Sequence, residues 1–208
     1  MTADGPAFPP GAFRKMDSED DAAFYAVPRL VTHIDDIAIA ALTQFYRGRL
    51  PAGGRILDLM SSWVSHLPPE IVFDEVIGHG MNAEELAANP RLNRFFVQNL
   101  NREPELPFGD TTLDAITVCV SIQYLEQPIK LLRECARILK LRGQIVISFS
   151  NRCFPTKAVA IWRQLSDDDH ARLVEFYLQN SGFADVAVHH LVDGLTSDLM
   201  IAVTGRKA

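Results

Sequence analysis

A carboxylate and two hydroxyl side chains follow the apolar pair Ile56 and Leu57 within a few residues. Asp58 comes directly after this pair, and Met60, Ser61 and Ser62 come shortly after Asp58. A carboxylate accepts hydrogen bonds from an ammonium group, and the backbone N–H groups of a tight turn can hold a carboxylate. Residues 58–62 are therefore a candidate site for a ligand that carries both groups. The alternative is structural, because Asp58 could instead cap a short helix after Ser61.

Polar turns recur after the later apolar segments. They occupy residues 78–82, 98–101, 121–125 and 148–154, and they include Gly80, Met81, Asn82, Asn99, Leu100, Asn101, Ser121, Gln123 and Tyr124. A single asparagine or serine often serves the backbone of its own turn, so no one of them identifies a site. Their recurrence is the informative feature, because the carboxyl ends of parallel strands meet at one edge of a sheet. We expect these turns to converge on a single cleft.

A mainly parallel sheet must bring these turns together. Strands are expected at residues 55–60, 71–77, 94–98, 113–121, 144–149, 183–191 and 198–204. Helices are expected within 18–47, divided at Pro28, at 81–88, 127–141 and 156–165, and from the caps at 167–169 to a residue before Gly182. Alternating strands and helices predict parallel strands, whereas the last two strands have no helix between them and must form an antiparallel hairpin. The expected fold class is α/β: a Rossmann-like, doubly wound, mainly parallel seven-stranded sheet with a C-terminal antiparallel hairpin and helices on both faces.

The length of 208 residues fits one domain. Residues 1–16 contain several prolines and glycines and are expected to form a flexible N-terminal tail. Residues 17–208 are expected to form a single domain, with a helical cover over 17–49 and the core over 50–208.

Charge and apolar content argue against several kinds of partner. The net charge is −6 and the basic residues are scattered, which argues against binding of nucleic acid. No apolar run is long enough to span a bilayer, so we expect no membrane partner. Residues 1–12 lack the features of a signal peptide, so we expect a cytoplasmic location. The three cysteines and six histidines have no ligand spacing, so no metal is expected. The sequence gives no expectation for the oligomeric state.

Two motifs resemble those of the class I S-adenosylmethionine-dependent methyltransferases, and the order of segments is similar to that family from about Leu50 onward. Ile-Leu-Asp at 56–58 is similar to the family's first motif. Leu-Pro-Phe-Gly-Asp at 106–110, followed by Leu-Asp at 113–114, is similar to the segment that opens its fourth strand. The sequence segments 58–63, 80–82 and 149–152 together resemble a type 11 branch of methyltransferase-like proteins.

The sequence departs from this family at three places. Residues 60–63 replace the glycine-rich loop of the first motif, and their side chains crowd the route by which backbone approaches the cofactor. Gly80 stands where the family has an acid that binds the ribose hydroxyls, and Asn99 stands where it has an acid near adenine. We expect Asn82 or Glu84 to supply the missing ribose contacts, because amide and carboxylate oxygens accept from hydroxyls.

The resemblance implies S-adenosylmethionine as the cofactor and a small-molecule substrate. The residues expected to bind the cofactor are Asp58, Met60, Ser61, Ser62, Gly80, Met81, Asn82, Asn99, Leu100, Asn101, Ser121 and Gln123. The residues expected to bind the substrate are Tyr25, Arg29, His33 and Tyr124. No catalytic residue is assigned.

The implied function is methyl transfer from S-adenosylmethionine to an unidentified small substrate, mainly by alignment of the reacting groups. The alternative is a methyltransferase-like protein that binds S-adenosylmethionine or a nucleoside without turnover, because the glycine loop and two acids are replaced. A nicotinamide oxidoreductase is a weaker rival, since no G-x-G-x-x-G loop follows the first strand.

Other residues have both a functional and a structural interpretation. On the cover, His33, Asp35 and Asp36 are candidate bases, or they belong to a solvated helix face. Three large aromatic residues, Phe24, Trp63 and Trp162, are candidate walls of a substrate pocket, or they are core residues.

Overall fold

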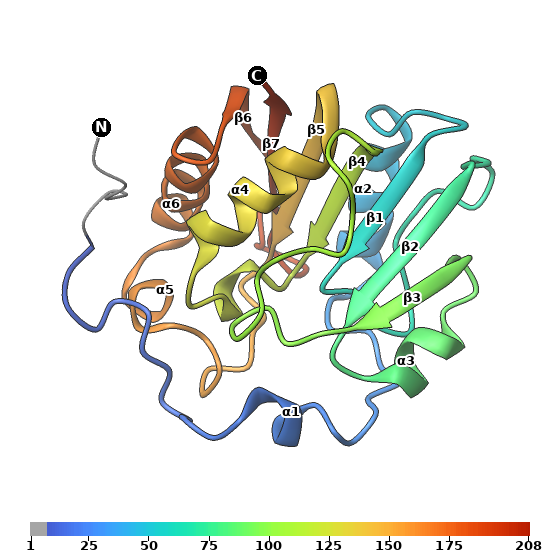
Figure 1. Ribbon diagram of the computed structural model, residues 1–208. Helices are drawn as coiled ribbons and strands as arrows, with labels where there is room; N and C mark the ends of the chain where they lie inside the picture. Colours follow the sequence, from blue (N-terminus) through green and yellow to red (C-terminus); the bar gives the residue numbers. More distant parts are fainter. Residues whose placement is uncertain (1–7) are drawn as a thin grey trace.

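The computed structural model describes residues 8–208 and contains a seven-stranded sheet (Figure 1). The strands are β1 (Arg55–Leu59), β2 (Glu75–Gly80), β3 (Arg94–Val97), β4 (Leu113–Cys119), β5 (Leu139–Phe149), β6 (Phe183–Val192) and β7 (Met200–Lys207). Their order in the sheet is β3-β2-β1-β4-β5-β7-β6. Strands β1 to β5 pair in parallel, and β7 pairs antiparallel with both β5 and β6. The expected fold class is confirmed, including the C-terminal antiparallel hairpin.

Helices cover both faces of the sheet (Figure 1). They are α1 (Asp21–Phe24), α2 (Asp36–Arg47), α3 (Ala83–Ala88), α4 (Pro128–Ile138), α5 (Ala160–Gln164) and α6 (Asp167–Gln179), with a 3-10 turn at Ile122–Tyr124. α2 buries Ala38, Leu42 and Tyr46, which are four residues apart, against one face. α4 and α6 lie on the opposite face, and Pro128 suits the first turn of α4, where no N–H is needed. No helix in residues 8–208 is both long and apolar enough to cross a membrane.

Three strands begin at residues other than those expected, and one of them, β7, begins at Met200 rather than at residue 198. β2 begins at Glu75 rather than at residue 71, because Val72 and Asp74 are hydrogen-bonded to the turn at 53–54. β5 begins at Leu139 rather than at residue 144, and α4 ends just before it. The cause is a bulge that lets the chain pair with β4 several residues earlier.

The helical segments are also shorter than expected. Residues 18–47 contain only the four-residue α1 and the α2 helix, with irregular chain around Pro28. α5 begins at Ala160 rather than at residue 156, because the carbonyl oxygen of Phe154 accepts from both Lys157 and Ala158 in a local turn.

The strand order reverses between β1 and β4. From β1 the chain moves outward through β2 and β3, and from β4 it moves the other way through β5. At such a switch point the connections leave on opposite sides and open a crevice at the carboxyl ends of the strands. Asp58 on β1 and Thr117 on β4 are direct partners in the register at this point.

The N-terminal segment runs beneath this edge of the sheet, where Figure 1 shows α1. The carbonyl oxygens of Ala12 and Arg14 accept from the N–H groups of Ile161 and Ala160 at 2.7 and 2.8 Å, and Phe13 packs against the core. These contacts correct the expectation of a flexible tail for residues 8–16. Residues 1–7 of the expected tail lie outside the described residues.

Candidate ligand-binding site

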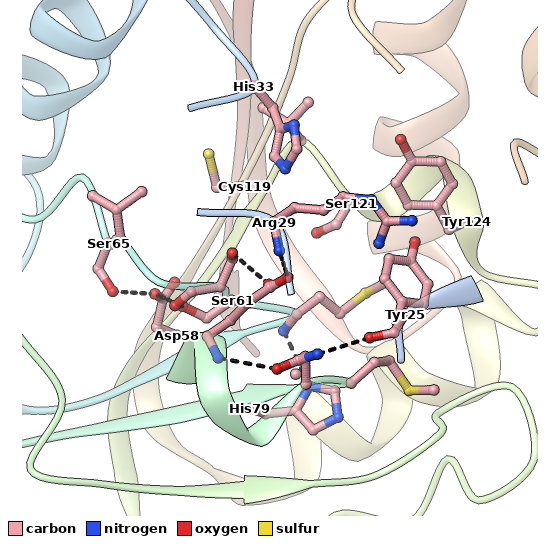
Figure 2. A pocket seen from close by; sticks show the side chains of 18 of the residues that line it. Tyr25, Arg29, His33, Asp58, Ser61, Ser65, His79, Cys119, Ser121 and Tyr124 are labelled. Carbon is pink, nitrogen blue, oxygen red and sulfur yellow. Dashed lines mark hydrogen bonds between the residues drawn. The ribbon is translucent and has the colours of Figure 1, made fainter. Parts of the chain in front are cut away.

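A cavity of about 430 Å³ opens between the carboxyl ends of β1–β4 and the N-terminal cover. This volume lies within the usual range for small-molecule pockets, about 300–1,000 Å³. Residues 29–34 of the cover, the turn after β1 and the turn after β4 all contribute to its walls. Figure 2 shows Asp58, Ser61 and Ser65 on one side of the cavity and Tyr25 and Tyr124 on the other side. His33 lies above these side chains in the view, and His79 lies below them.

Asp58 lines this cavity with a carboxylate that has no basic partner among residues 8–208. It accepts hydrogen bonds from the hydroxyls of Ser61, Ser65 and Thr117, the last at 2.8 Å. Only 5% of the residue is exposed, and in the described chain no Lys, Arg or His nitrogen lies within 4.0 Å of its carboxylate. Hydroxyls lower the cost of burying a carboxylate but do not supply an opposite charge. No helix follows Ser61 before α3, so the capping alternative for Asp58 is wrong.

His79 holds the turn after β1 in place. Its Nδ1 accepts from the N–H of Met60 at 3.1 Å, and its carbonyl oxygen accepts from the N–H of Ser61 at 2.6 Å. Its Nε2 donates to the carbonyl oxygen of Gln98 at 3.0 Å. Burial lowers the pKa of His79 to about 4, so the ring is neutral at pH 7. The N–H of Ser61, which we expected to meet a ligand carboxylate, is therefore used within the protein, whereas no described group accepts from that of Ser62.

Asn82 serves the protein's own structure. Its amide oxygen accepts from the N–H groups of Glu84 and Glu85, which caps α3, and its amide nitrogen donates to the carbonyl oxygens of Tyr25 and Ala26. Glu84 is exposed and does not line the cavity. The ribose contacts expected of Asn82 or Glu84 are therefore corrected, because one side chain is fully used and the other points elsewhere.

Glu85 is a cavity carboxylate that the sequence analysis missed. It is 8% exposed, and it accepts from the N–H of Arg29 and from the hydroxyl of Ser62, both at 2.7 Å. No basic side chain of the described residues lies within 4.0 Å of it. The only available signal is Asn82 followed three residues later by Glu85, which predicts a local capping box and no role in a cavity.

The asparagines after β3 line the cavity and also support their own turn. The side-chain oxygen of Asn99 accepts from the N–H of Asn101 at 3.1 Å, and the amide nitrogen of Asn101 donates to Asp21 and to the carbonyl oxygen of Tyr124. The amide nitrogen of Asn99 has only a contact of 3.5 Å with Asp20. Asn99 therefore has a donor that a ligand can use, whereas Asn101 has none.

Two residues after β4 differ in their placement. Ser121 lines the cavity and is 7% exposed, and its hydroxyl has no partner among the described residues. Gln123 is buried away from the cavity, where its amide nitrogen donates to the carbonyl oxygen of Val120, so its expected place in the site is corrected. Tyr46 of α2 supplies a second cavity-lining hydroxyl that has no partner within residues 8–208. Buried hydroxyls usually have partners, so these two unsatisfied groups are unusual features of the cavity wall.

Two buried lysines anchor the cover. Lys157 is fully buried and lies 3.0 Å from Asp17 and 3.4 Å from Asp21, and Lys15 lies 2.6 Å from Asp21. Burial lowers the pKa of Lys157, but the interactions with the two aspartates outweigh this effect and raise the pKa of the lysine. Burial raises the pKa of Asp21, but the hydrogen bonds from Lys15 and Asn101 more than offset this effect and lower it. The cluster is therefore charged and fixes α1 below the cavity.

The residues expected to bind substrate differ in their ability to accept a proton. Burial raises the pKa of Tyr124 to about 12 and that of Tyr25 further, so both are protonated at pH 7. His33 lies at the exposed rim, where desolvation and Arg29 lower its pKa while Glu85 opposes them. His33 is therefore neutral at pH 7 and can accept a proton.

Every residue expected at the site, except Gln123, lines the cavity. Of the expected base candidates, only His33 does so, because Asp35 caps α2 and Asp36 is exposed elsewhere. None of the three large aromatic residues lines it. Trp63 donates its indole N–H to the carbonyl oxygen of Val31 at 3.0 Å. It therefore links the turn after β1 to the N-terminal cover and does not fill the pocket.

The described residues offer no ready metal site. Within residues 8–208, no group of three or more His, Cys, Asp and Glu side chains is arranged to hold a metal ion. Cys119 and Cys153 line the cavity as free thiols, and burial raises the pKa of Cys119 to about 12.

Comparison with known proteins agrees with this architecture. Residues 70–147 match the model of a family described as "Methyltransferase domain". The match begins after β1 and its turn, and it runs through β2, β3 and β4 into β5. No curated protein matches the chain.

Three solved structures illustrate the shared fold. An S-adenosylmethionine-dependent methyltransferase from Mesorhizobium loti has a TM-score of 0.57 and 18% identity, over 81% of this chain and 98% of that one. One from Archaeoglobus fulgidus has a TM-score of 0.59 and 15% identity, over 81% and 94% of the two chains. Phosphoethanolamine N-methyltransferase 2 of Haemonchus contortus, solved with S-adenosyl-L-methionine, has a TM-score of 0.58 and 16% identity, over 82% and 52%. The chain therefore has the fold of the class I S-adenosylmethionine-dependent methyltransferases, and residues 70–147 are similar in sequence to a methyltransferase domain.

Proposed function

We propose that this chain binds S-adenosylmethionine in the cavity and transfers its methyl group to a small-molecule substrate. The observation that carries the proposal is Asp58, a buried carboxylate with three hydroxyl donors and no cationic partner among the described residues. An ammonium group on a ligand would supply the missing opposite charge, and buried charges are normally paired. Glu85 supports the same conclusion at a second place in the cavity.

Other features of the cavity suit the remaining parts of this cofactor. The amide nitrogen of Asn99, which has only a 3.5 Å contact with Asp20, is available as a donor to hydroxyl groups or ring nitrogens. The N–H of Ser62 is available for a carboxylate. When bound, the cofactor would supply an activated methyl group on a sulfonium centre.

The protein's own contribution would be alignment, exclusion of water and removal of one proton. The cover, held by Lys157 and its two aspartates, closes one side of the cavity and limits access of water. Tyr25 and Tyr124 give the opposite wall rigid surfaces. His33 at the rim is suited to accept a proton from the methylated group.

Binding without turnover is the second candidate, and the turn after β1 favours it. The N–H groups of Met60 and Ser61 are both bonded to His79, and the hydroxyl of Ser61 is bonded to Asp58. A turn that satisfies its own donors has fewer to offer the amino-acid part of the cofactor.

Calorimetry tests the cofactor binding that both candidates share and separates them from a site for another ligand. We expect S-adenosylmethionine and S-adenosylhomocysteine to bind with dissociation constants of about 1–100 μM, the range of an ordinary cofactor site. Absence of heat with both compounds would contradict the proposal. If both bind, incubation with pooled small molecules and detection of S-adenosylhomocysteine by mass spectrometry distinguishes turnover from binding alone.

A further inference from the structure

Arg29 is a cavity-lining cation without a carboxylate partner in the described chain. No Asp or Glu oxygen of residues 8–208 lies within 4.0 Å of its guanidinium group. The other arginine of the cavity, Arg152, lies 3.8 Å from Asp198, and the two buried lysines below are paired with aspartates. The free positive charge of the cavity is therefore concentrated at Arg29.

The guanidinium group of Arg29 is held in position while most of its donors stay free. It lies 4.5 Å from the ring centre of Phe24 and 5.6 Å from that of Phe154. One nitrogen donates to the carbonyl oxygen of Phe24 at 2.9 Å, and the other makes a weaker contact of 3.4 Å with Val27. An arginine has five N–H donors, so about three are left for a ligand.

The cavity therefore has unpaired charge of both signs. The negative charge belongs to Asp58 and Glu85, and the positive charge belongs to Arg29 on the cover, which Figure 2 shows among the cavity side chains with Ser121 and Tyr124. Planar guanidinium groups bind carboxylate and phosphate oxygens through parallel hydrogen bonds. We infer that the methyl acceptor carries an anionic group, a carboxylate or a phosphate, which Arg29 binds. This inference rests on the proposed methyl transfer for the identity of the ligand as an acceptor.

A purely structural role for Arg29 makes a different prediction. Its contacts with Phe24 and Val27 organise the cover, and a structural arginine would affect neutral and anionic ligands equally. If Arg29 recognises an anion, its substitution would weaken binding of the charged ligand and leave binding of the neutral ligand unchanged.

The test compares two probes that share a primary amine, 3-aminopropylphosphonate and 3-aminopropanol, on the full chain with S-adenosylhomocysteine present. Tryptophan fluorescence is a suitable signal, because Trp63 is bonded to the cover at Val31. We expect the phosphonate to bind at least about tenfold more tightly than the alcohol, as expected for charge-assisted hydrogen bonds. Arg29→Gln should remove this preference, and Arg29→Lys should keep part of it. Arg142→Gln, which changes an exposed arginine outside the cavity, should leave it unchanged.

Two results would overturn the inference: equal affinity of the wild-type chain for both probes, including no detectable binding of either, or equal weakening of both probes by Arg29→Gln. Failure of the proposed function is seen separately. If the wild-type chain gives no heat with S-adenosylmethionine or S-adenosylhomocysteine but prefers the phosphonate through Arg29, the anion site is retained and methyl transfer is rejected.

Discussion

The carbonyl oxygen of Ser61 lies 2.6 Å from the point that a Cβ atom on Gly80 would occupy. Real Cβ atoms essentially never come so close to another heavy atom, and Leu86 lies only 3.3 Å away on another side. Any side chain at residue 80 must therefore displace the turn after β1. The missing glycines of that turn and the missing acid at residue 80 are thus parts of one packing arrangement.

Gly80→Ala is expected to destabilise the protein by about 1–3 kcal/mol, because the added methyl group overlaps backbone that cannot move freely. Thermal or urea unfolding measures this loss. Gly109→Ala is the matched control, since its new Cβ would be 3.6 Å from Thr112, and we expect a change within about 0.5 kcal/mol. Equal stability of the two variants would show that the turn adjusts without cost.

Asp58→Asn is expected to weaken binding of S-adenosylmethionine at least about tenfold, because it removes the charge that would pair with the ligand's ammonium group. The free energy of unfolding should change by less than about 1 kcal/mol, since loss of an unpaired buried charge offsets poorer hydroxyl contacts. Calorimetry and urea unfolding give the two values. Asp74→Asn changes an exposed aspartate outside the cavity and should alter neither. Unchanged affinity in Asp58→Asn would remove Asp58 from the site.

His79 should make the protein less stable as the pH falls. Its pKa is lowered from 6.5 to about 4 in the folded state, so the unfolded chain takes up a proton first. The stabilisation that neutral His79 provides is complete above about pH 6.5 and is lost between about pH 6.5 and 4. The free energy of unfolding therefore falls by about 2 kcal/mol between pH 7 and pH 5. His79→Gln can accept from Met60 and donate to Gln98 without titrating. Its free energy of unfolding should therefore fall about 2 kcal/mol less over that interval, and an identical pH profile would reject this role.

Lys157→Met is expected to destabilise the protein by about 3–5 kcal/mol, because it leaves Asp17 without its buried partner and leaves Asp21 with Lys15 alone. Lys130→Met removes an exposed lysine that pairs with Glu105, and it should cost less than about 1 kcal/mol. Adding Asp17→Asn to Lys157→Met should recover part of the loss. If Lys157→Met unfolds like Lys130→Met, the buried cluster does not anchor the cover.

The sequence alone was sufficient for the order of strands and helices and for the C-terminal hairpin. Strand segments rich in Val, Ile and Phe, the Pro128 start of α4 and the absence of a helix before β7 are local signals, and local signals determine local structure. The same signals placed polar turns after successive strands. In a parallel sheet such turns share one edge, which is why nearly all of the expected residues line one cavity.

Only the tertiary structure decided which of these polar groups a ligand can use. Asn82 and Ser61 are occupied by the protein's own partners, Gln123 points away, and Glu85 turns from its helix into the cavity. Residue 60 adopts a left-handed φ of 58°, as glycine does readily, although the sequence has methionine there. Hydrogen-bond partners, burial and unpaired charge depend on residues far apart in the chain. The sequence therefore determined where the cavity lies, and long-range packing decided its charges and its free donors.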